Sequence, residues 1–164
     1  MPVTATIGVY GFDAVTFSKT LLAAGVDLLV DVRQRRGVRG SQYAWANSLR
    51  LQGLLAGAGI AYSHHRELAP TTELRHLQYR ADDRTGVGKR TRELLAPEYV
   101  ARYTSEILDH VDLGPLICEL DARSGLGALL CVESEPAACH RSLITARLAE
   151  RHGYSVTHLR PPAS

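Results

Sequence analysis

The sequence predicts one α/β domain of three layers, with helices on both faces of a mostly parallel sheet of about five strands. Short apolar runs alternate with segments of helical periodicity, which is the pattern of α/β folds. The runs are continuously apolar, as strands buried on both faces are. No internal repeat, linker or low-complexity block interrupts the 164 residues, so we expect residues 1–164 to form one domain.

Five segments have the length and the apolar character of buried strands. The clearest is VDLLVDV at residues 26–32, which suits a central position in the sheet. The five expected strands are residues 6–10, 26–32, 60–64, 128–132 and 154–158.

Helices are expected between these strands, where apolar side chains recur at helical spacing. Asp13 is a suitable N-cap for the first helix, which Gly25 would end. Asn47 is a suitable cap for the second, and Pro97 would begin another. These signals place a helix after each of the first two strands and before the fourth.

Two stretches fit the alternation less well. Residues 65–92 are polar and rich in Arg and Thr, so we expect a long connection that could act as a lid, with a helix near residues 72–79. Residues 116–118 could be a short strand or the buried end of the preceding helix. The sequence leaves both readings open.

The overall composition predicts the surroundings of the protein more than its activity. With 45% hydrophobic residues and a formal net charge of +2, the chain is not a polycation. No signal peptide is recognisable, and no apolar stretch approaches the roughly 20 residues of a membrane span. Three cysteines in such a chain are expected to be reduced thiols, so we expect a cytoplasmic protein without a membrane partner. The oligomeric state is left open.

The loop after residues 26–32 combines basic, glycine and aromatic residues without an acid. Like charges this dense repel one another, so a folded loop that holds them suggests an anionic partner. Glycines let backbone N–H groups approach a phosphate, and aromatic rings can stack on a base. The alternatives are a solvated basic loop and, for Trp45, an anchor beneath the next helix. The candidate anion-binding or substrate-binding residues here are Arg33, Arg35, Arg36, Arg39, Tyr43 and Trp45.

Polar side chains also end the second and third expected strands. Asp31 could be a general base, a metal ligand or the ion-pair partner of a loop arginine. His64 and His65 end the third strand, and we expect one to face the site and the other to face solvent or a helix. His64 is the candidate acid or base.

The stretch LLCVESEPAACHRSLI, residues 129–144, joins a strand to a helix. Cys131 and Glu133 would end the strand, and Pro136 can take the first position of the helix. Residues 139–141 would then lie in the first turns of that helix. Open α/β sheets place their sites at this edge.

This stretch is compatible with more than one chemistry. Cys139, near a helix N-terminus beside His140 and Arg141, could be a nucleophile. Arg141 follows it by only two residues, however, so the CxxxxxR loop of phosphatases is absent from the sequence. An anion site built from Arg141 and the helix N-terminus fits better, with Glu133 as the acid or base. Cys131 and Cys139 could line that pocket or pack as small apolar residues.

No metal site is predicted from the spacing. Cys131-x7-Cys139-His140 lacks the paired spacing of zinc motifs, and neighbouring Cys139 and His140 would project in different directions from a helix. A further ligand would have to come from His64 or Glu133. The sequence therefore requires no cofactor, although a divalent metal is possible.

These motifs resemble the bacterial and archaeal domain-of-unknown-function family 488. Its pattern runs TIG-S, DVR-x-x-P, Y-x-H-L-x-x-LGG and C-x-E-x-x-x-x-x-CHR. The resemblance spans nearly the whole chain and implies the fold and the site, without a secure reaction. The matching positions are Gly8, Asp31, Arg33, Tyr62, His64, Leu68, Cys131, Glu133, Cys139, His140 and Arg141.

The sequence departs from the family pattern in three places. Arg36 stands where DVR-x-x-P has its proline, and Ala69-Pro70 replaces the two glycines of LGG. Tyr10-Gly11 stands near the expected serine. With the additional arginines, these departures suggest a subgroup that has its own ligand.

Three functions are compatible with these residues. The favoured one is an enzyme, a hydrolase or transferase that acts on a nucleotide, a nucleic acid or another phosphate-bearing substrate. Asp31 or Glu133 would be its base or metal ligand, and His64 or His140 its acid. The alternatives are a non-catalytic nucleic-acid-binding module and a metal or redox protein that uses its thiols.

Overall fold

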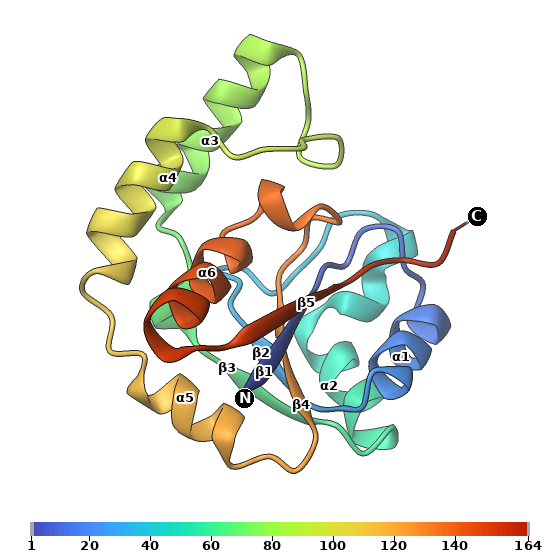
Figure 1. Ribbon diagram of the computed structural model, residues 1–164. Coiled ribbons are helices and arrows are strands. Elements are labelled where there is room, and N and C mark those ends of the chain that lie inside the picture. The colour runs from blue at the N-terminus through green and yellow to red at the C-terminus, as the bar shows by residue number, and fades with distance from the viewer. Residues whose placement is uncertain (1, 164) are drawn as a thin grey trace.

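Five parallel strands form the sheet of this computed structural model, which describes residues 2–163. The strand order is β3-β2-β4-β1-β5, and every neighbouring pair is parallel (Figure 1). The predicted fold class is confirmed. The strands are β1 (Val3–Ile7), β2 (Val26–Asp31), β3 (Ala61–His64), β4 (Leu126–Leu130) and β5 (Ser155–Leu159).

Helices cover both faces of this sheet. Figure 1 shows α1 and α2 on one face and α5 and α6 on the other, which gives the three layers. None of the described helices is long and apolar enough to cross a membrane. Their bounds are α1 (Ala14–Ala23), α2 (Ser48–Gly57), α3 (Thr72–Thr85), α4 (Pro97–Tyr103), α5 (Gly114–Asp121) and α6 (Arg141–His152). Short 3-10 helices lie at Ser41–Ala46, Arg66–Leu68 and Pro136–Ala138, and a π turn at Thr104–Leu108 continues α4.

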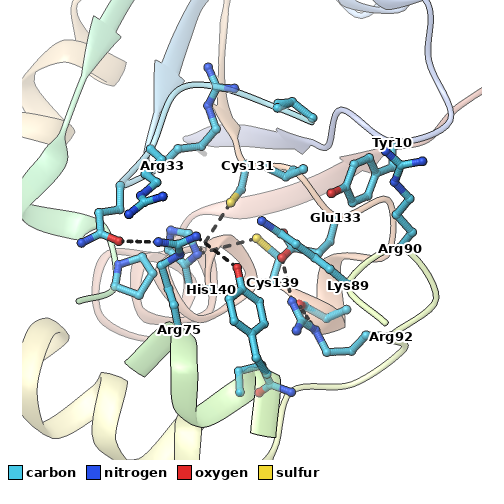
Figure 2. Close-up of a pocket in the computed structure, with 18 of the residues that line it drawn as sticks. Tyr10, Arg33, Arg75, Lys89, Arg90, Arg92, Cys131, Glu133, Cys139 and His140 are labelled. Carbon is cyan, nitrogen blue, oxygen red and sulfur yellow. Dashed lines mark hydrogen bonds and ion pairs between the residues drawn. The ribbon is translucent and has the colours of Figure 1, made fainter. Parts of the chain in front are cut away.

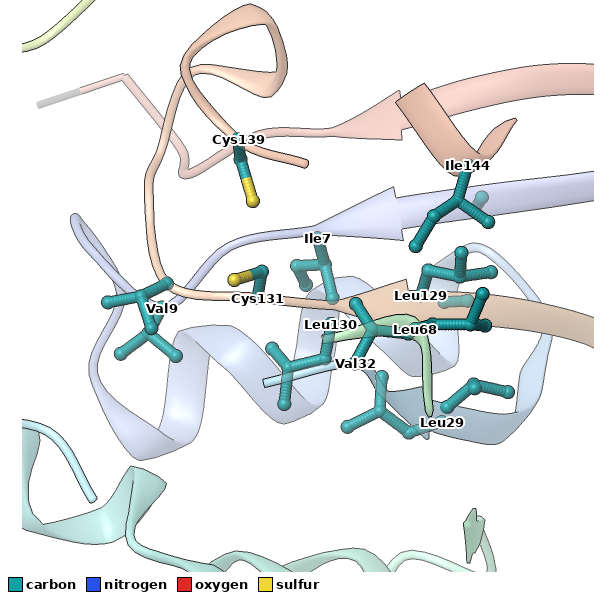
Figure 3. Close-up of a cluster of buried hydrophobic side chains, with 14 of the residues drawn as sticks. Ile7, Val9, Leu29, Val32, Leu68, Leu129, Leu130, Cys131, Cys139 and Ile144 are labelled. Atoms are coloured by element: carbon teal, nitrogen blue, oxygen red, sulfur yellow. The ribbon is translucent and has the colours of Figure 1, made fainter. Parts of the chain in front are cut away.

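The core is centred on β4, the middle strand. Leu129 pairs with Thr6 of β1 and Val30 of β2, and its side chain is fully buried. Because both faces of the sheet are covered, the central strands have apolar residues on both faces. Figure 3 shows this cluster, with the sulfurs of Cys131 and Cys139 near the carboxyl ends of the strands.

β1 lies three residues earlier than the predicted strand at residues 6–10. Its polar Thr4 resembles a surface residue in the sequence, yet it is buried and its hydroxyl donates to the carbonyl O of Gly127 at 2.9 Å. Tyr10 therefore lies beyond the strand, where its N–H donates to the carbonyl O of Val132 at 3.0 Å. This places the Tyr10 ring at the carboxyl edge of the sheet.

Both predicted helix caps are found, but they act differently. Asp13 and Thr16 form a reciprocal capping box at the start of α1. Asn47 occupies the N-cap position of α2, but its side chain accepts from the N–H of Val38 at 2.8 Å and makes no cap hydrogen bond. The Asn47 side chain therefore holds the loop between β2 and α2 in place and does not cap α2.

The two ambiguous stretches are helical. α3 continues to Thr85, beyond the predicted residue 79, because Gly86 ends it in a left-handed conformation with φ of 74°. Residues 116–118 belong to α5, so neither the short strand nor the end of the preceding helix was right. Leu116 and Leu120 form the buried face of α5, and this apolar character is what the sequence shares with a strand.

The last helix begins later than predicted. Pro136 opens a 3-10 turn, and α6 starts only at Arg141. Cys139 is extended, with φ of −139° and ψ of 145°, and His140 is the N-cap residue. The prediction that residues 139–141 lie in the first turns is therefore wrong for the first two. The extended backbone of Cys139 therefore directs its side chain differently from that of a helical residue.

Candidate functional site

A cavity of about 1,100 Å³ lies at the carboxyl ends of the central strands (Figure 2). The chain leaves β1 through α1 on one face of the sheet and leaves β4 through α6 on the other. Open α/β sheets bind ligands where their connections diverge in this way. The cavity walls come from the loop after β2, from α3, from residues 88–92 and from the ends of β4 and the following turn.

Positive charge dominates the walls of this cavity. Among the described residues that line it, seven carry a cationic side chain and Glu133 is the single carboxylate. Such a surface attracts anions and disfavours cationic ligands. The cationic residues are Arg33, Arg35, Arg39, Arg75, Lys89, Arg90 and Arg92.

Two sulfurs and one imidazole meet on the wall between β4 and α6. The Sγ atoms of Cys131 and Cys139 each lie 3.8 Å from Nδ1 of His140. Nε2 of His140 lies 2.8 Å from the carbonyl O of Val32. Since a carbonyl only accepts, Nε2 carries a proton and Nδ1 faces the sulfurs (Figure 2). All three side chains are buried, and they border the cavity.

This contact makes the two thiols unequal. Burial raises the pKa of the Cys139 thiol, but the hydrogen bond from Cys131 and the positive charge of His140 bring that pKa well below its ordinary value. The same hydrogen bond, together with burial, raises the pKa of Cys131 well above its ordinary value. Burial lowers the pKa of His140, but the Cys139 thiolate more than offsets this and raises it. The thiolate form is therefore favoured more at Cys139 than at Cys131.

Glu133 is held beside the thiols by a buried arginine. Arg92 donates from Nη2 to Oε1 of Glu133 at 2.7 Å and from Nη1 to Oδ2 of Asp82 at 2.6 Å. The loop over the cavity is thus tied to α3 and to the strand end. Oε2 of Glu133 is buried without a hydrogen-bond partner among residues 2–163. Burial raises the pKa of Glu133 despite the nearby positive charges of Lys89 and Arg92.

Asp31 lies behind the cavity wall and is the ion-pair partner of Arg33. The two side chains form hydrogen bonds of 2.9 and 2.8 Å, and Arg33 also donates to the carbonyl O of Ala46 at 3.0 Å. The Tyr62 hydroxyl donates to Asp31 at 2.6 Å, and Arg36 donates to that hydroxyl at 3.4 Å. Burial raises the pKa of Asp31, but these hydrogen bonds and the charge of Arg33 outweigh it and lower the pKa.

Arg141 lies behind the strand end rather than in the cavity. Its fully buried side chain donates to the carbonyl O of Glu133 at 2.6 Å and to that of Ser134 at 3.4 Å. Gly8 makes room for this arrangement, because a Cβ there would overlap the carbonyl of Glu133. Arg141 therefore shapes the loop that carries Glu133, and its guanidinium is not presented to an anion in the cavity.

His64 and His65, at the end of β3, form hydrogen bonds with a backbone carbonyl and with two surface carboxylates. Nε2 of His64 donates to the carbonyl O of Arg33 at 2.9 Å. His65 bridges Glu67 at 2.7 Å and Glu119 at 3.0 Å. In the described structure neither histidine lines the cavity. The geometry therefore offers no support for His64 as an acid or base.

The aromatic residues of the loop divide between core and cavity mouth. The Trp45 ring packs on Phe17 with centroids 4.8 Å apart. Trp45 therefore anchors the loop in the core and is not available to stack on a base. Tyr43 lies 5.3 Å from Tyr10, and the Arg90 guanidinium lies 5.3 Å from the centroid of each tyrosine ring. The two tilted tyrosine rings and the Arg90 guanidinium are thus in mutual contact beside the cavity.

Sequence reasoning missed the wall that the long polar connection supplies. Arg75 and Tyr79 are four residues apart on α3, and their side chains are joined by a hydrogen bond of 3.1 Å. Their helical spacing was a signal that could have found them. The remaining missed residues follow α3 in a loop without periodicity, where only the excess of basic residues gave a hint. They are Lys89, Arg90 and Arg92, and His76 of α3 also lines the cavity.

Comparison with known proteins supports a family but adds no activity. No curated protein and no solved structure matches the chain. A family model, described as domain of unknown function DUF488, matches residues 13–148. This match covers most of the chain and includes the residues from Asp31 to His140 that surround the cavity. The chain therefore belongs to the DUF488 family.

Proposed function

We propose that the protein is an enzyme that acts on a phosphate-bearing small molecule of nucleotide size. The observation that carries this proposal is the cavity wall, which holds seven cationic side chains and, among the described lining residues, the single carboxylate of Glu133. A volume of about 1,100 Å³ suits a ligand of this size. Arginine and lysine bind phosphate oxygens through charge-assisted hydrogen bonds.

Lys89 and the arginines of the cavity would hold the phosphates. Lys89 is half-buried, and the negative charge of Glu133 raises its pKa although burial lowers it. Arg35, Arg39 and Arg90 are exposed at the mouth, where they can meet an incoming anion. Arg33 and Arg92 are already paired with carboxylates, so we assign them to positioning.

Glu133 is the residue to which we assign the reaction. Its Oε2 points into a buried region without a hydrogen-bond partner among the described residues. A substrate hydroxyl or a water could donate to this oxygen and so be oriented or activated. Asp31 lacks such a free oxygen position because Arg33 and Tyr62 occupy its carboxylate.

Binding is tested first, by calorimetric titration of the full chain with inorganic phosphate, pyrophosphate, nucleoside mono- and triphosphates, and short DNA and RNA. The Lys89→Met variant should bind its best small ligand roughly 10- to 100-fold more weakly, since a hydrogen bond to a charged group contributes about 1.5–3 kcal/mol. The matched control is Lys19→Met, which removes the only other lysine, exposed on α1. Equal affinities of the two variants would refute the assignment of the phosphate site.

Catalysis is tested on the ligands that bind, by mass spectrometry of products after incubation with wild-type protein and with Glu133→Gln. The proposal expects turnover by the wild type, and binding without turnover by the variant. Full activity of Glu133→Gln would refute its role. Tight, strongly salt-dependent binding of DNA or RNA without turnover would instead identify a nucleic-acid-binding module.

A further inference from the structure

The cluster of Cys131, Cys139 and His140 has the arrangement of a three-ligand metal site. Their ligand atoms all lie within 4.8 Å of one another, and both sulfurs lie 3.8 Å from the same nitrogen. Figure 2 shows both sulfurs on the same side of the imidazole, with dashed lines that converge on one ring nitrogen. Packing of small apolar side chains does not by itself require this convergence on one nitrogen.

These separations agree with zinc coordination. Zn–S bonds of about 2.3 Å and Zn–N bonds of about 2.0–2.1 Å at tetrahedral angles place sulfur and nitrogen ligands roughly 3.6 Å apart. The two observed Sγ–Nδ1 distances, 3.8 Å each, are close to this value. A small inward movement of the side chains would complete the coordination.

The surroundings of His140 supply the second requirement of a metal site. Its Nε2 donates to the carbonyl O of Val32 at 2.8 Å, which leaves Nδ1 as the atom that faces the sulfurs. A hydrogen bond from the distal nitrogen to a carbonyl is the usual support of a metal-bound histidine. Cys131 directly follows β4, and Cys139 and His140 directly precede α6, so packed elements hold the ligands in place.

We propose that Cys131, Cys139 and His140 bind one Zn²⁺ ion whose fourth coordination position opens into the cavity. Structural zinc sites use four protein ligands, whereas three protein ligands and an open position are the pattern of catalytic sites. All three residues border the cavity, so a water or a substrate atom can reach the ion. Two thiolates balance the charge of Zn²⁺, so the ion fits a basic cavity. This site does not depend on the phosphate-bearing substrate proposed above.

The backbone conformation of Cys139 and His140 explains why the sequence spacing did not predict a metal site. Adjacent residues of a helix project in different directions, but Cys139 is extended and His140 is an N-cap residue. Cys139 and His140 can therefore meet at one point. Neither His64 nor Glu133, which the sequence offered as further ligands, belongs to the cluster found among the described residues.

Cobalt titration of the full chain tests this site directly. Co²⁺ replaces Zn²⁺ at tetrahedral thiolate sites and then shows thiolate-to-metal charge-transfer bands and intense visible bands. Metal-free wild-type protein should bind one equivalent of Co²⁺ with these bands, and one equivalent of Zn²⁺ should bleach them. The test needs no substrate and no variant. Absence of the charge-transfer bands in folded wild-type protein would overturn the proposal.

Variants then identify the ligands. Cys131→Ser, Cys139→Ser and His140→Gln should each weaken Zn²⁺ binding by at least about 100-fold, because even the loss of an outer hydrogen bond costs 10- to 100-fold. The matched control is Cys118→Ser, which removes the exposed thiol of α5 and should leave binding unchanged. Circular dichroism checks that each variant is folded. Retention of the cobalt bands by folded Cys139→Ser, or their loss in Cys118→Ser, would also overturn the assignment.

Discussion

Asp31 and Arg33 are two residues apart in the chain and form a buried ion pair with hydrogen bonds of 2.9 and 2.8 Å. Neither side chain is more than 2% exposed. Positions i and i+2 of an extended chain share a face, so the pair follows directly from the strand geometry. It sets the direction of Arg33, whose third nitrogen reaches the 3-10 turn through Ala46.

Replacement of Asp31 with Asn should strongly destabilise the fold. It leaves the buried Arg33 guanidinium without its carboxylate, and loss of one partner of a buried ion pair costs about 3–5 kcal/mol. Urea denaturation at neutral pH measures this change in the free energy of unfolding. A change no larger than that caused by a surface substitution would contradict the predicted cost of losing this ion pair.

Asp31 also predicts the acid sensitivity of the fold. Its pKa in the folded protein is lower than the ordinary value of 3.8, so folding favours the ionised form. The resulting stabilisation is complete above the unfolded pKa and is lost as the pH falls through the lowered folded value. Wild-type protein should therefore lose stability below about pH 4 more steeply than Asp31→Asn. Parallel acid limbs in denaturation curves would contradict this assignment.

The strands and the sheet edge could be predicted because buried parallel strands leave a local apolar signal. The start of β1 could not, since Thr4 is polar and its burial depends on a carbonyl far away in the sequence. The start of α6 could not either, because Pro136 suits the first turn of a 3-10 helix as well as that of an α-helix. Arg141 was identified as important, but only the fold reveals that its partners are backbone carbonyls.

The fit between Gly8 and the Glu133 loop predicts a substitution with a large effect. In Gly8→Ala the new Cβ would overlap the carbonyl of Glu133 and lie 3.3 Å from Nη2 of Arg141, so the loop must move. Overpacking of this kind costs about 1–3 kcal/mol.

Gly53→Ala is the matched control, because Gly53 is inside α2 with open space around it. Thermal denaturation should show a fall for Gly8→Ala and a rise for the control, since Ala favours helix over Gly by roughly 0.5–1 kcal/mol. Equal melting temperatures would refute the tight fit.

Arg92 anchors the loop over the cavity, residues 86–96, and its replacement should release this loop. Arg92→Met leaves the buried carboxylates of Asp82 and Glu133 without their shared partner, which should cost about 3–5 kcal/mol. It should also expose the loop at residues 86–96 to proteases. Arg102→Met is the matched control, because Arg102 pairs with two carboxylates at the surface and its loss should change stability little. Limited proteolysis and urea denaturation compare the two variants. Equal cleavage of both would contradict the anchoring role of Arg92.

Replacement of Arg90 should weaken ligand binding with little loss of stability. Its exposed guanidinium lies over the rings of Tyr10 and Tyr43 and donates from Nη2 to the carbonyl O of Arg39 at 3.0 Å, which leaves its other N–H groups for an anion. Arg90→Ala should weaken binding of pyrophosphate or a nucleoside triphosphate roughly 10-fold, because a charge-assisted hydrogen bond is lost. Arg50→Ala, on the exposed side of α2, removes the same charge away from the cavity and should leave affinity unchanged. Calorimetry at two salt concentrations separates the local contact from the general field, since the general field is screened by salt whereas the contact persists. If both variants lose affinity equally, Arg90 acts through net charge and makes no contact with the ligand.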